Sequence, residues 1–499
     1  MKITCPYCFE EFEDHQVHFR METCFGEGEL NDLGLPLDEI EHMDNSPEKE
    51  ALLAQMAERQ PFETGQSSRY QQFWSVYGAT SEKYTDFDRR VYRCASYELP
   101  VIDPLNAPEH SLRAPDGSRD VLIRDRKSGM VTAVIDRFGH ETKRRVCPHC
   151  HNPLPQSYGQ HEVKFISVIG VSGSGKTIYI SQMLKYMQKY ASYAGMAAFP
   201  LSHAESDFVN DNPVIQGHPL APSNMSGRLS QPMFYDLMYK DEKKGNVTNT
   251  IVLFDIAGED CITPEGMQRF GRFVRNSHGI IFLVDPRQLG LIGMTGQVDA
   301  PPTQVIDAIH HIWNSAVTIP MAVCVPKSDM FSLPETHPND IIHSDITVED
   351  GMRFNATQYN HIVMPLKNLI QNADGLPLLN ALKMNFPNHN LFAFSSIGCS
   401  VEKRDIDGLE RSVPVGPTFP RRIAEPLLWM FFKFGYIRSD VKIRLPFRRE
   451  FPEMITDYEN ASFFQKLTKK YPKRPLNESE KQVYDYEQRC FTIPADSAQ

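Results

Sequence analysis

The chain has 499 residues, a formal net charge of −11 at pH 7, and 41% hydrophobic and 23% charged residues. This length suffices for two to four domains, and the acidic balance disfavours a protein that binds nucleic acid over its whole surface. No apolar run approaches the roughly 18 residues that a membrane-spanning helix requires, and the N-terminal MKITCPYC lacks the apolar segment of a secretory signal. We therefore expect a cytoplasmic globular protein without a membrane span.

Two C-x-x-C pairs stand far apart in the chain: CPYC holds Cys5 and Cys8, and CPHC holds Cys147 and Cys150. Two thiolates at this spacing can hold one Zn²⁺, and two such pairs complete a closed tetrahedral site. The pairs predict a zinc ribbon that is split between residues 1–24 and 137–158.

A second metal assignment remains open. A finger-like set is formed by Cys5, Cys8, His18 and Cys24 alone. The second pair would then need a ligand from Cys94, His140, His149 or His151. We prefer the ribbon because CPYCFEEF and RRVCPHCHNPLP read as matching halves, each a knuckle followed by a strand.

Two regions separate the cysteine pairs. Residues 26–60 carry ten acidic and two basic side chains with few large apolar ones, so we expect residues 25–69 to form a flexible acidic linker. Residues 70–136 are expected to form a small aromatic-rich insert. Within it, VLIRDRKSGMVTAVID alternates around a Lys-Ser-Gly turn, which predicts a β-hairpin.

Short apolar strands alternate with helical stretches from residue 161 to residue 440. The strands are VKFISVI, TIVLFD, GIIFLVD, MAVCVP and LFAFS. This alternation predicts an α/β domain with a mostly parallel sheet and helices on both faces, and ligands of such sheets bind at the carboxyl ends of the strands. Residues 441–499, rich in Pro and charge, are expected to be a peripheral C-terminal tail.

The stretch GVSGSGKT lies between the first of these strands and the helical sequence IYISQMLKYMQKY. Glycines permit backbone conformations that turn main-chain N–H groups inward, and the N-terminus of the helix attracts an anion. The strand–loop–helix setting is the one in which G-x-x-x-x-G-K-[ST] holds nucleotide phosphates. The residues assigned to phosphate binding are Gly170, Ser172, Gly173, Ser174, Gly175, Lys176 and Thr177.

The next strand ends in DIAGED. Asp255 is expected to help hold Mg²⁺ opposite Thr177, and Gly258 to bring its backbone N–H near a γ-phosphate. Glu259 can orient or deprotonate the attacking water, although an exposed loop carboxylate is an equally good interpretation.

Two later strands end in groups suited to guanine. A carboxylate at Asp329 can accept two N–H bonds from the guanine edge, while the stem of Lys327 lies along the base. Backbone N–H groups at Ser395 and Ser396 can meet the guanine carbonyl. The K-x-D and S-S patterns are each weak evidence alone. Their order, each directly after a buried strand, makes a guanine site a stronger prediction.

The ordered motifs GVSGSGKT, DIAG, PKSD and SSIG resemble those of TRAFAC-class P-loop GTPases over about residues 163–437. With the N-terminal cysteine module, DIAGED is similar to the double-GTPase-type proteins encoded by bacteria. The resemblance implies a P-loop fold, GTP and Mg²⁺ as ligands, and catalytic roles for Lys176, Thr177, Asp255 and Glu259.

Three departures from the family pattern stand out. Pro326 replaces the Asn or Thr that usually precedes the Lys and braces the phosphate loop. No switch threonine is assigned, with Ser223, Ser226 and Thr250 left as alternatives. Glu259 stands where many Ras-like GTPases carry a Gln that positions the water. Arg269, Arg272 or Arg275 could serve as a charge-stabilising arginine, although each alone is more often part of a solvated helix face.

The sequence thus predicts a GTP-binding switch or hydrolase that uses Mg²⁺ and carries Zn²⁺, with a protein partner recruited by the zinc module. One alternative is a non-catalytic nucleotide-binding scaffold, and another is a general P-loop ATPase. A nucleic-acid-binding protein that uses the ribbon and the basic residues 143–145 fits the acidic composition less well.

Overall fold

The computed structural model describes residues 2–20, 43–44, 46–51, 68–77, 101–105, 122–135, 141–171, 173–221, 229–241, 243–293, 301–313, 317–333, 343–346, 353–406, 408–444, 446, 454–457, 460–468 and 470–475. Most of the expected acidic linker and of the C-terminal tail lies outside these ranges, as do Ser172, Cys24, Cys94, His140, Ser223 and Ser226.

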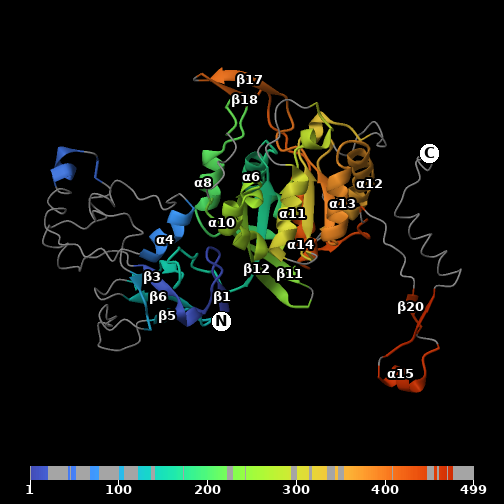
Figure 1. Cartoon of the computed structure of the whole chain (residues 1–499). Helices are drawn as coiled ribbons and strands as arrows, with labels where there is room; N and C mark the ends of the chain where they lie inside the picture. The colour runs from blue at the N-terminus through green and yellow to red at the C-terminus, as the bar shows by residue number, and fades with distance from the viewer. Residues whose placement is uncertain are drawn as a thin grey trace.

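One seven-stranded sheet forms the centre of the molecule (Figure 1). Its strand order is β10-β11-β12-β9-β13-β14-β16, and the five strands from β12 to β16 are mutually parallel. Strands β10 and β11 extend it in antiparallel fashion. The predicted mostly parallel sheet is confirmed. The strands are β9 (Glu162–Gly170), β10 (Ala197–Pro200), β11 (Met233–Asp241), β12 (Gly245–Ala257), β13 (Gly279–Leu283), β14 (Met321–Val325) and β16 (His389–Ala393).

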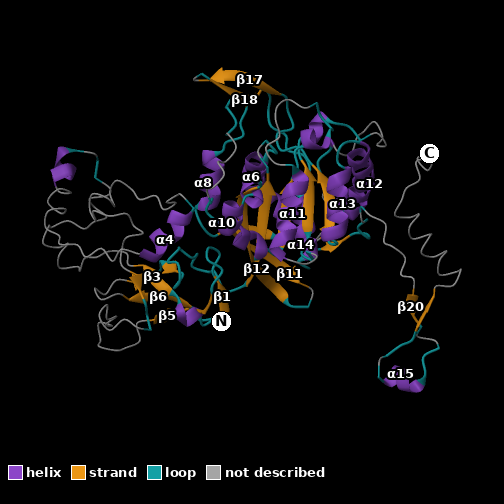
Figure 2. Ribbon diagram, viewed as in Figure 1, coloured by secondary structure: helices purple, strands orange, loops and turns teal. Residues whose placement is uncertain are grey.

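Every residue of β13, β14 and β16 is buried. A parallel strand is buried along its whole length only when both faces of the sheet are covered, which explains the near-continuous apolar sequences. Helices flank the sheet in Figure 2. They are α6 (Lys176–Lys185), α7 (Met187–Tyr193), α8 (Ala204–Asp211), α9 (Glu259–Ile262), α10 (Pro264–Arg275), α11 (Pro302–Trp313), α12 (Ala356–Asn372), α13 (Leu376–Asn385) and α14 (Glu425–Lys433).

The helical stretch after the phosphate loop is two helices rather than one. Tyr186 separates α6 from α7 with φ −107° and ψ 10°, outside the helical region. Both helices bury apolar side chains, among them Met183, Met187 and Tyr190. The apolar periodicity continues across Tyr186 because both helices bury that face.

Short strands around the two cysteine pairs form the N-terminal module. They are β1 (Lys2–Thr4), β2 (Glu11–Glu13), β3 (His18–Arg20), β4 (Val101–Ile102), β5 (Leu122–Arg124), β6 (Val131–Ile135), β7 (Glu141–Thr142) and β8 (Arg145–Val146), with helix α4 (Ser68–Val76). Strands β5 and β6 pair as the expected hairpin. However, β4 pairs with β3 and β7 with β6, so sheets join residues of the expected insert to the ribbon halves.

Further elements follow β16. Strands β17 (Val401–Ile406) and β18 (Leu409–Pro414) form an exposed hairpin at the top of Figure 1. The others are β15 (Arg353–Phe354), β19 (Arg438–Ser439), β20 (Met454–Thr456), α15 (Phe463–Leu467) and β21 (Lys473–Pro475). No helix in the described part of the chain is long and apolar enough to cross a membrane.

Candidate functional site

The phosphate loop joins the carboxyl end of β9 to the first turn of α6. Gly173 and Gly175 adopt left-handed φ values of 77° and 82°, a region that favours glycine. Lys176 and Thr177 begin the helix and are buried. The loop thus presents a buried cation and hydroxyl at a helix N-terminus, the arrangement that favours a bound anion.

Lys176 pairs with the carboxylate at the end of the adjacent parallel strand. Its Nζ lies 2.5 Å from Oδ1 of Asp255, and both side chains are buried. The Oγ of Ser230 donates to Oδ2 of Asp255 at 3.4 Å. With Thr177 next to Lys176 in the chain, this corner supplies the oxygen ligands that Mg²⁺ prefers.

Gly258 lies directly against the phosphate loop. Its N–H donates to the carbonyl oxygen of Gly170 at 3.0 Å, and a Cβ on this residue would approach Val171 and Gly170 to 3.0–3.2 Å. A larger residue would push the two loops apart. The N–H expected to face a γ-phosphate is paired with the loop here, and Glu259 follows as the first residue of α9.

Lys327 reaches the phosphate loop from the end of β14. Its backbone is left-handed (φ 59°), and its Nζ donates to the carbonyl oxygen of Gly173 at 2.7 Å. Asp329 lies nearby in a single 3-10 turn (Ser328–Met330), with its carboxylate exposed. The structure therefore brings both residues of the PKSD motif to the loop side of the sheet.

The SSIG loop after β16 is held by a neighbouring segment. The N–H of Ser395 donates to the carbonyl oxygen of Arg421 at 3.0 Å, and its Oγ accepts a bond from the N–H of Gly398 at 2.9 Å. The Ser395 N–H that was expected to meet a base is therefore bonded within the protein.

Buried hydroxyls provide a test of whether this site suits a polar ligand. Within the described residues, the Oγ atoms of Ser174, Ser328 and Ser396 are buried and have no hydrogen-bond partner. Buried polar atoms in proteins nearly always find a partner. These hydroxyls lie in the phosphate loop, the PKSD motif and the SSIG loop, so the residues fit a polar ligand that contacts all three.

Asp285 and Arg287 belong to this site although the motifs did not indicate them. Asp285 follows β13 and accepts a bond from Nζ of Lys327 at 3.2 Å and from Nε of Arg287 at 3.0 Å. The signal available was that GIIFLVD, like its neighbours, ends in a polar residue at the carboxyl edge of the sheet.

Thr250 is excluded as a switch residue. It lies in β12 opposite Val163, at the start of β9 and far along the strand from the phosphate loop. Its hydroxyl donates to Asp236 at 2.6 Å within the sheet. The sequence already placed Thr250 at the start of TIVLFD and Asp255 at its end, which agrees with this position.

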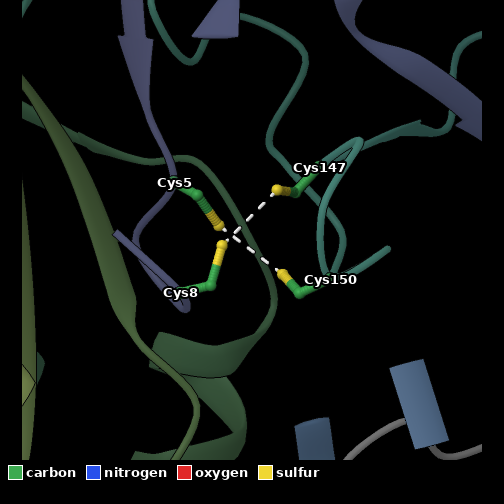
Figure 3. A group of neighbouring side chains, drawn as sticks. All are labelled: Cys5, Cys8, Cys147 and Cys150. Atoms are coloured by element: carbon green, nitrogen blue, oxygen red, sulfur yellow. Dashed lines mark hydrogen bonds between the residues drawn. The ribbon is translucent and has the colours of Figure 1, made fainter. Parts of the chain in front are cut away.

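The four paired cysteines converge on one point (Figure 3). Their sulfur atoms all lie within 4.8 Å of one another. The Cys5 and Cys150 sulfurs, and the Cys8 and Cys147 sulfurs, are each 3.7 Å apart. Four thiols in this arrangement fit a structural zinc site.

His18, the ligand of the finger-like alternative, has other neighbours. Its Nε2 lies 3.6 Å from Asp103, and its ring centroid lies 5.6 Å from that of His151. Burial lowers the pKa of His18 despite the nearby carboxylate. Among the described residues, the thiol cluster does not include it.

The two knuckles have the same backbone geometry. Phe9 and His151, each directly after the second Cys of a pair, are left-handed at φ 59° and 54°. Each donates its N–H to the carbonyl of the first Cys, at 3.0 and 2.9 Å. The N–H groups of Tyr7 and His149 point at the first sulfur of each pair, at 3.4 and 3.3 Å. Such N–H donors stabilise thiolates, the form that binds metal.

The thiols influence one another strongly. Burial raises the pKa of Cys5, and the hydrogen bond with Cys150 raises that of Cys147. Hydrogen bonds from Cys147 and Cys150 lower the pKa of Cys8. Thiolates this close together repel one another, and a divalent cation would offset this repulsion.

The cysteine module packs on α10, the helix that follows DIAGED. Phe9 makes edge contacts with Phe254 and Phe273, with centroids 5.8 and 5.2 Å apart. The Tyr77 hydroxyl donates to the carbonyl of Arg269 at 2.9 Å. A cavity of about 250 Å³ lies beside this contact, between α4, the second knuckle and Arg272.

Comparisons with known proteins agree with these motifs. Residues 164–364 match the family model Double-GTPase 2. The resemblance to double-GTPase proteins is confirmed, and the matched Double-GTPase 2 region runs from β9 into α12. It includes the phosphate loop, Asp255 and Lys327.

One curated relative of this chain is the putative ESX-1 scaffolding and assembly protein SaeC of Mycolicibacterium smegmatis. It is 24% identical over 151 residues, and the match spans 30% of this chain and 39% of that protein.

Similar solved structures include a variant of Aquifex aeolicus Era bound to GDP·AlF4⁻, with 10% identity, coverage of 47% of this chain and 52% of that chain, and a TM-score of 0.21. Sup35 complexed with GMPPNP has 9% identity, 47% and 38% coverage, and a TM-score of 0.20. At these TM-scores neither structure informs the geometry of the site.

Proposed function

We propose that this protein binds GTP and hydrolyses it as a molecular switch. The supporting observation is that the phosphate loop after β9 contacts Asp255 near the end of β12 and Lys327 after β14, all at the carboxyl edge of one parallel sheet. Ligands of open parallel sheets bind at this edge, and the matched family is a GTPase family.

The proposed chemistry is an in-line attack of water on the γ-phosphate. Lys176 would leave its pairing with Asp255 to contact the phosphates, because a triphosphate carries several negative charges and the carboxylate of Asp255 only one. Thr177 and Asp255 would hold a magnesium ion, which neutralises charge on the phosphates when it is bound. Glu259 would orient the water.

Base selection would fall to Asp329. Its carboxylate accepts hydrogen bonds, and guanine offers N–H donors on the matching edge whereas adenine presents an acceptor at N1. The stem of Lys327, fixed at Gly173, would lie along the base, and the hydroxyl of Ser396 would be available to the ligand.

A second candidate function is a scaffold that binds the nucleotide but does not hydrolyse it. The relative SaeC is described as a putative scaffolding and assembly protein. The cavity between α4, the second knuckle and Arg272 offers a place where the cysteine module could recruit a protein partner. Zinc held by the four cysteines would keep the module folded for this role.

Phosphate release from GTP, measured with and without Mg²⁺, separates the two functions. The switch function predicts Mg²⁺-dependent release that exceeds release from ATP and falls at least about tenfold in a Glu259→Ala variant. GTP binding without release in the presence of Mg²⁺ would favour the scaffold. Equal release from ATP and GTP would indicate a general P-loop ATPase.

A further inference from the structure

A three-residue charge cluster touches the phosphate loop at Gly173. Asp285 accepts bonds from Nε of Arg287, at 3.1 and 3.0 Å to its two oxygens, and from Nζ of Lys327 at 3.2 Å. Lys327 in turn donates to the carbonyl of Gly173 at 2.7 Å. A Cβ added to Gly173 would lie 2.6 Å from Nη2 of Arg287. The guanidinium therefore packs directly on the loop backbone.

The cluster is partly sheltered from solvent. The side chain of Asp285 is 3% exposed, whereas those of Arg287 and Lys327 are 34% and 30% exposed. Burial alone would raise the pKa of Asp285, but the hydrogen bonds from Arg287 and the charge of Lys327 outweigh it and lower the pKa. Asp285 is therefore an ionised group that holds two cations in place.

The backbone around Asp285 fixes its orientation. Its Oδ1 accepts the N–H of Arg287 at 3.0 Å and caps the 3-10 turn Pro286–Leu289. Pro286 begins this turn, and a proline at that position has no N–H to leave unpaired. Arg287 is thereby placed two residues beyond Asp285 with its guanidinium folded back onto the carboxylate.

Pro326 lies next to Lys327 and lacks a side chain that could brace the phosphate loop, so the loop needs other contacts. In the sequences that this chain resembles, an Asn or Thr at that position braces the phosphate loop, and proline offers no side-chain donor. We propose that Asp285 and Arg287 are positioning residues that brace the phosphate loop through Lys327 and Gly173, and that they slow nucleotide release. This inference rests on the proposed nucleotide binding.

The two residues act through different contacts. Removing the carboxylate of Asp285 leaves the charges of Arg287 and Lys327 without a counter-ion. It also takes away one of the two hydrogen-bond acceptors of Lys327 Nζ. Removing the guanidinium of Arg287 takes away the side chain that packs on Gly173. Either change loosens the loop, so nucleotide should leave faster while its rate of entry changes little.

The test is the dissociation rate of a fluorescent GDP analogue from full-length protein, chased with unlabelled GDP. Arg287→Ala and Asp285→Asn should each raise this rate about tenfold, and Arg287→Lys should give an intermediate rate because lysine cannot form the bidentate pair. Arg404→Ala is the matched control. Arg404 pairs with a carboxylate two residues away, at 3.3 Å from Glu402, but on the exposed hairpin, and its removal should leave the rate unchanged.

A double-mutant cycle tests the route of the effect. If Asp285 acts through Lys327, Asp285→Asn should add little to Lys327→Ala, and the effects should be non-additive. Additive effects, or unchanged release from Arg287→Ala, would overturn the inference while leaving nucleotide binding intact. Failure of the wild-type protein to bind the analogue would overturn both this inference and the proposed function.

Discussion

The exposed carboxylate of Asp329 is the residue on which base choice depends. Guanine presents N–H donors at N1 and at its exocyclic amine, whereas adenine presents a lone pair at N1 that the carboxylate repels. A site built to hydrogen-bond a ligand rejects analogues that leave its polar groups unpaired. We expect GTP to bind more tightly than ATP by about 2 kcal/mol.

Replacing Asp329 by Asn should weaken GTP and improve xanthosine triphosphate, which carries an oxygen where guanine has its amine. Competition against a fluorescent nucleotide measures both affinities. Asp307→Asn, an exposed carboxylate on α11, is the control and should change neither. Equal ATP and GTP affinities in the wild type, unaltered in the Asn variant, would show that Asp329 does not read the base.

Site residues could be predicted from the sequence where the residues next to them in the chain form a recognisable motif. Lys176 and Asp255 could be predicted because a glycine-rich turn and a strand end identify them. Asp285 could be recognised only as a polar residue at a strand end. Its contact with Lys327, and that of Arg287 with Gly173, could not be predicted, since these residues lie far apart in the sequence and meet only after the sheet forms. For the same reason, the hydrogen bond from the Ser395 N–H to the carbonyl oxygen of Arg421 could not be predicted from the sequence.

At the scale of elements, the two knuckles make the sharpest prediction. Their thiols come from opposite ends of the N-terminal module yet lie within 4.8 Å of one another. Purified protein should carry about one zinc ion, and Cys147→Ser with Cys150→Ser should abolish it, because two thiolates no longer close a tetrahedral site. Elemental analysis gives the metal content directly.

Cys399→Ser provides the matched control, since that thiol lies apart from the cluster and donates to Gly416 at 3.4 Å. It should retain full zinc. Loss of zinc should also lower the melting temperature, because metal binding supplies folding free energy to such modules. Zinc that stays bound in the Cys147/Cys150 variant would instead support the finger formed with His18 and Cys24.

Hydrophobic periodicity predicted where the strands lie better than it predicted which strands pair with each other. The hairpin β5–β6 and the sheet strands carry their signal within a few residues. The pairing of β4 with β3 does not, because two-residue strands have no periodicity to read. The hydrogen bond from the Leu220 N–H to Ser412 on β18 is likewise a contact between distant segments.

At the scale of the whole molecule, the cysteine module and the GTPase-like region share one core. Phe9 and Tyr77 pack against α10, which follows the loop that contains Gly258. The sequence predicted two adjacent units but not this contact, because aromatic packing between them leaves no local pattern. The contact places the cysteine module against α10, the second helix after Gly258.

The central claim is that the carboxyl edge of the sheet binds GTP through the phosphate loop. Equilibrium binding of a fluorescent GTP analogue to wild type and to Lys176→Ala tests it most directly, with Lys403→Ala on the exposed hairpin as control and the melting temperature as a check of folding. We predict at least about tenfold weaker binding for Lys176→Ala, or about 1.4 kcal/mol, and no change for the control. Unchanged affinity in a folded Lys176→Ala variant would contradict the claim.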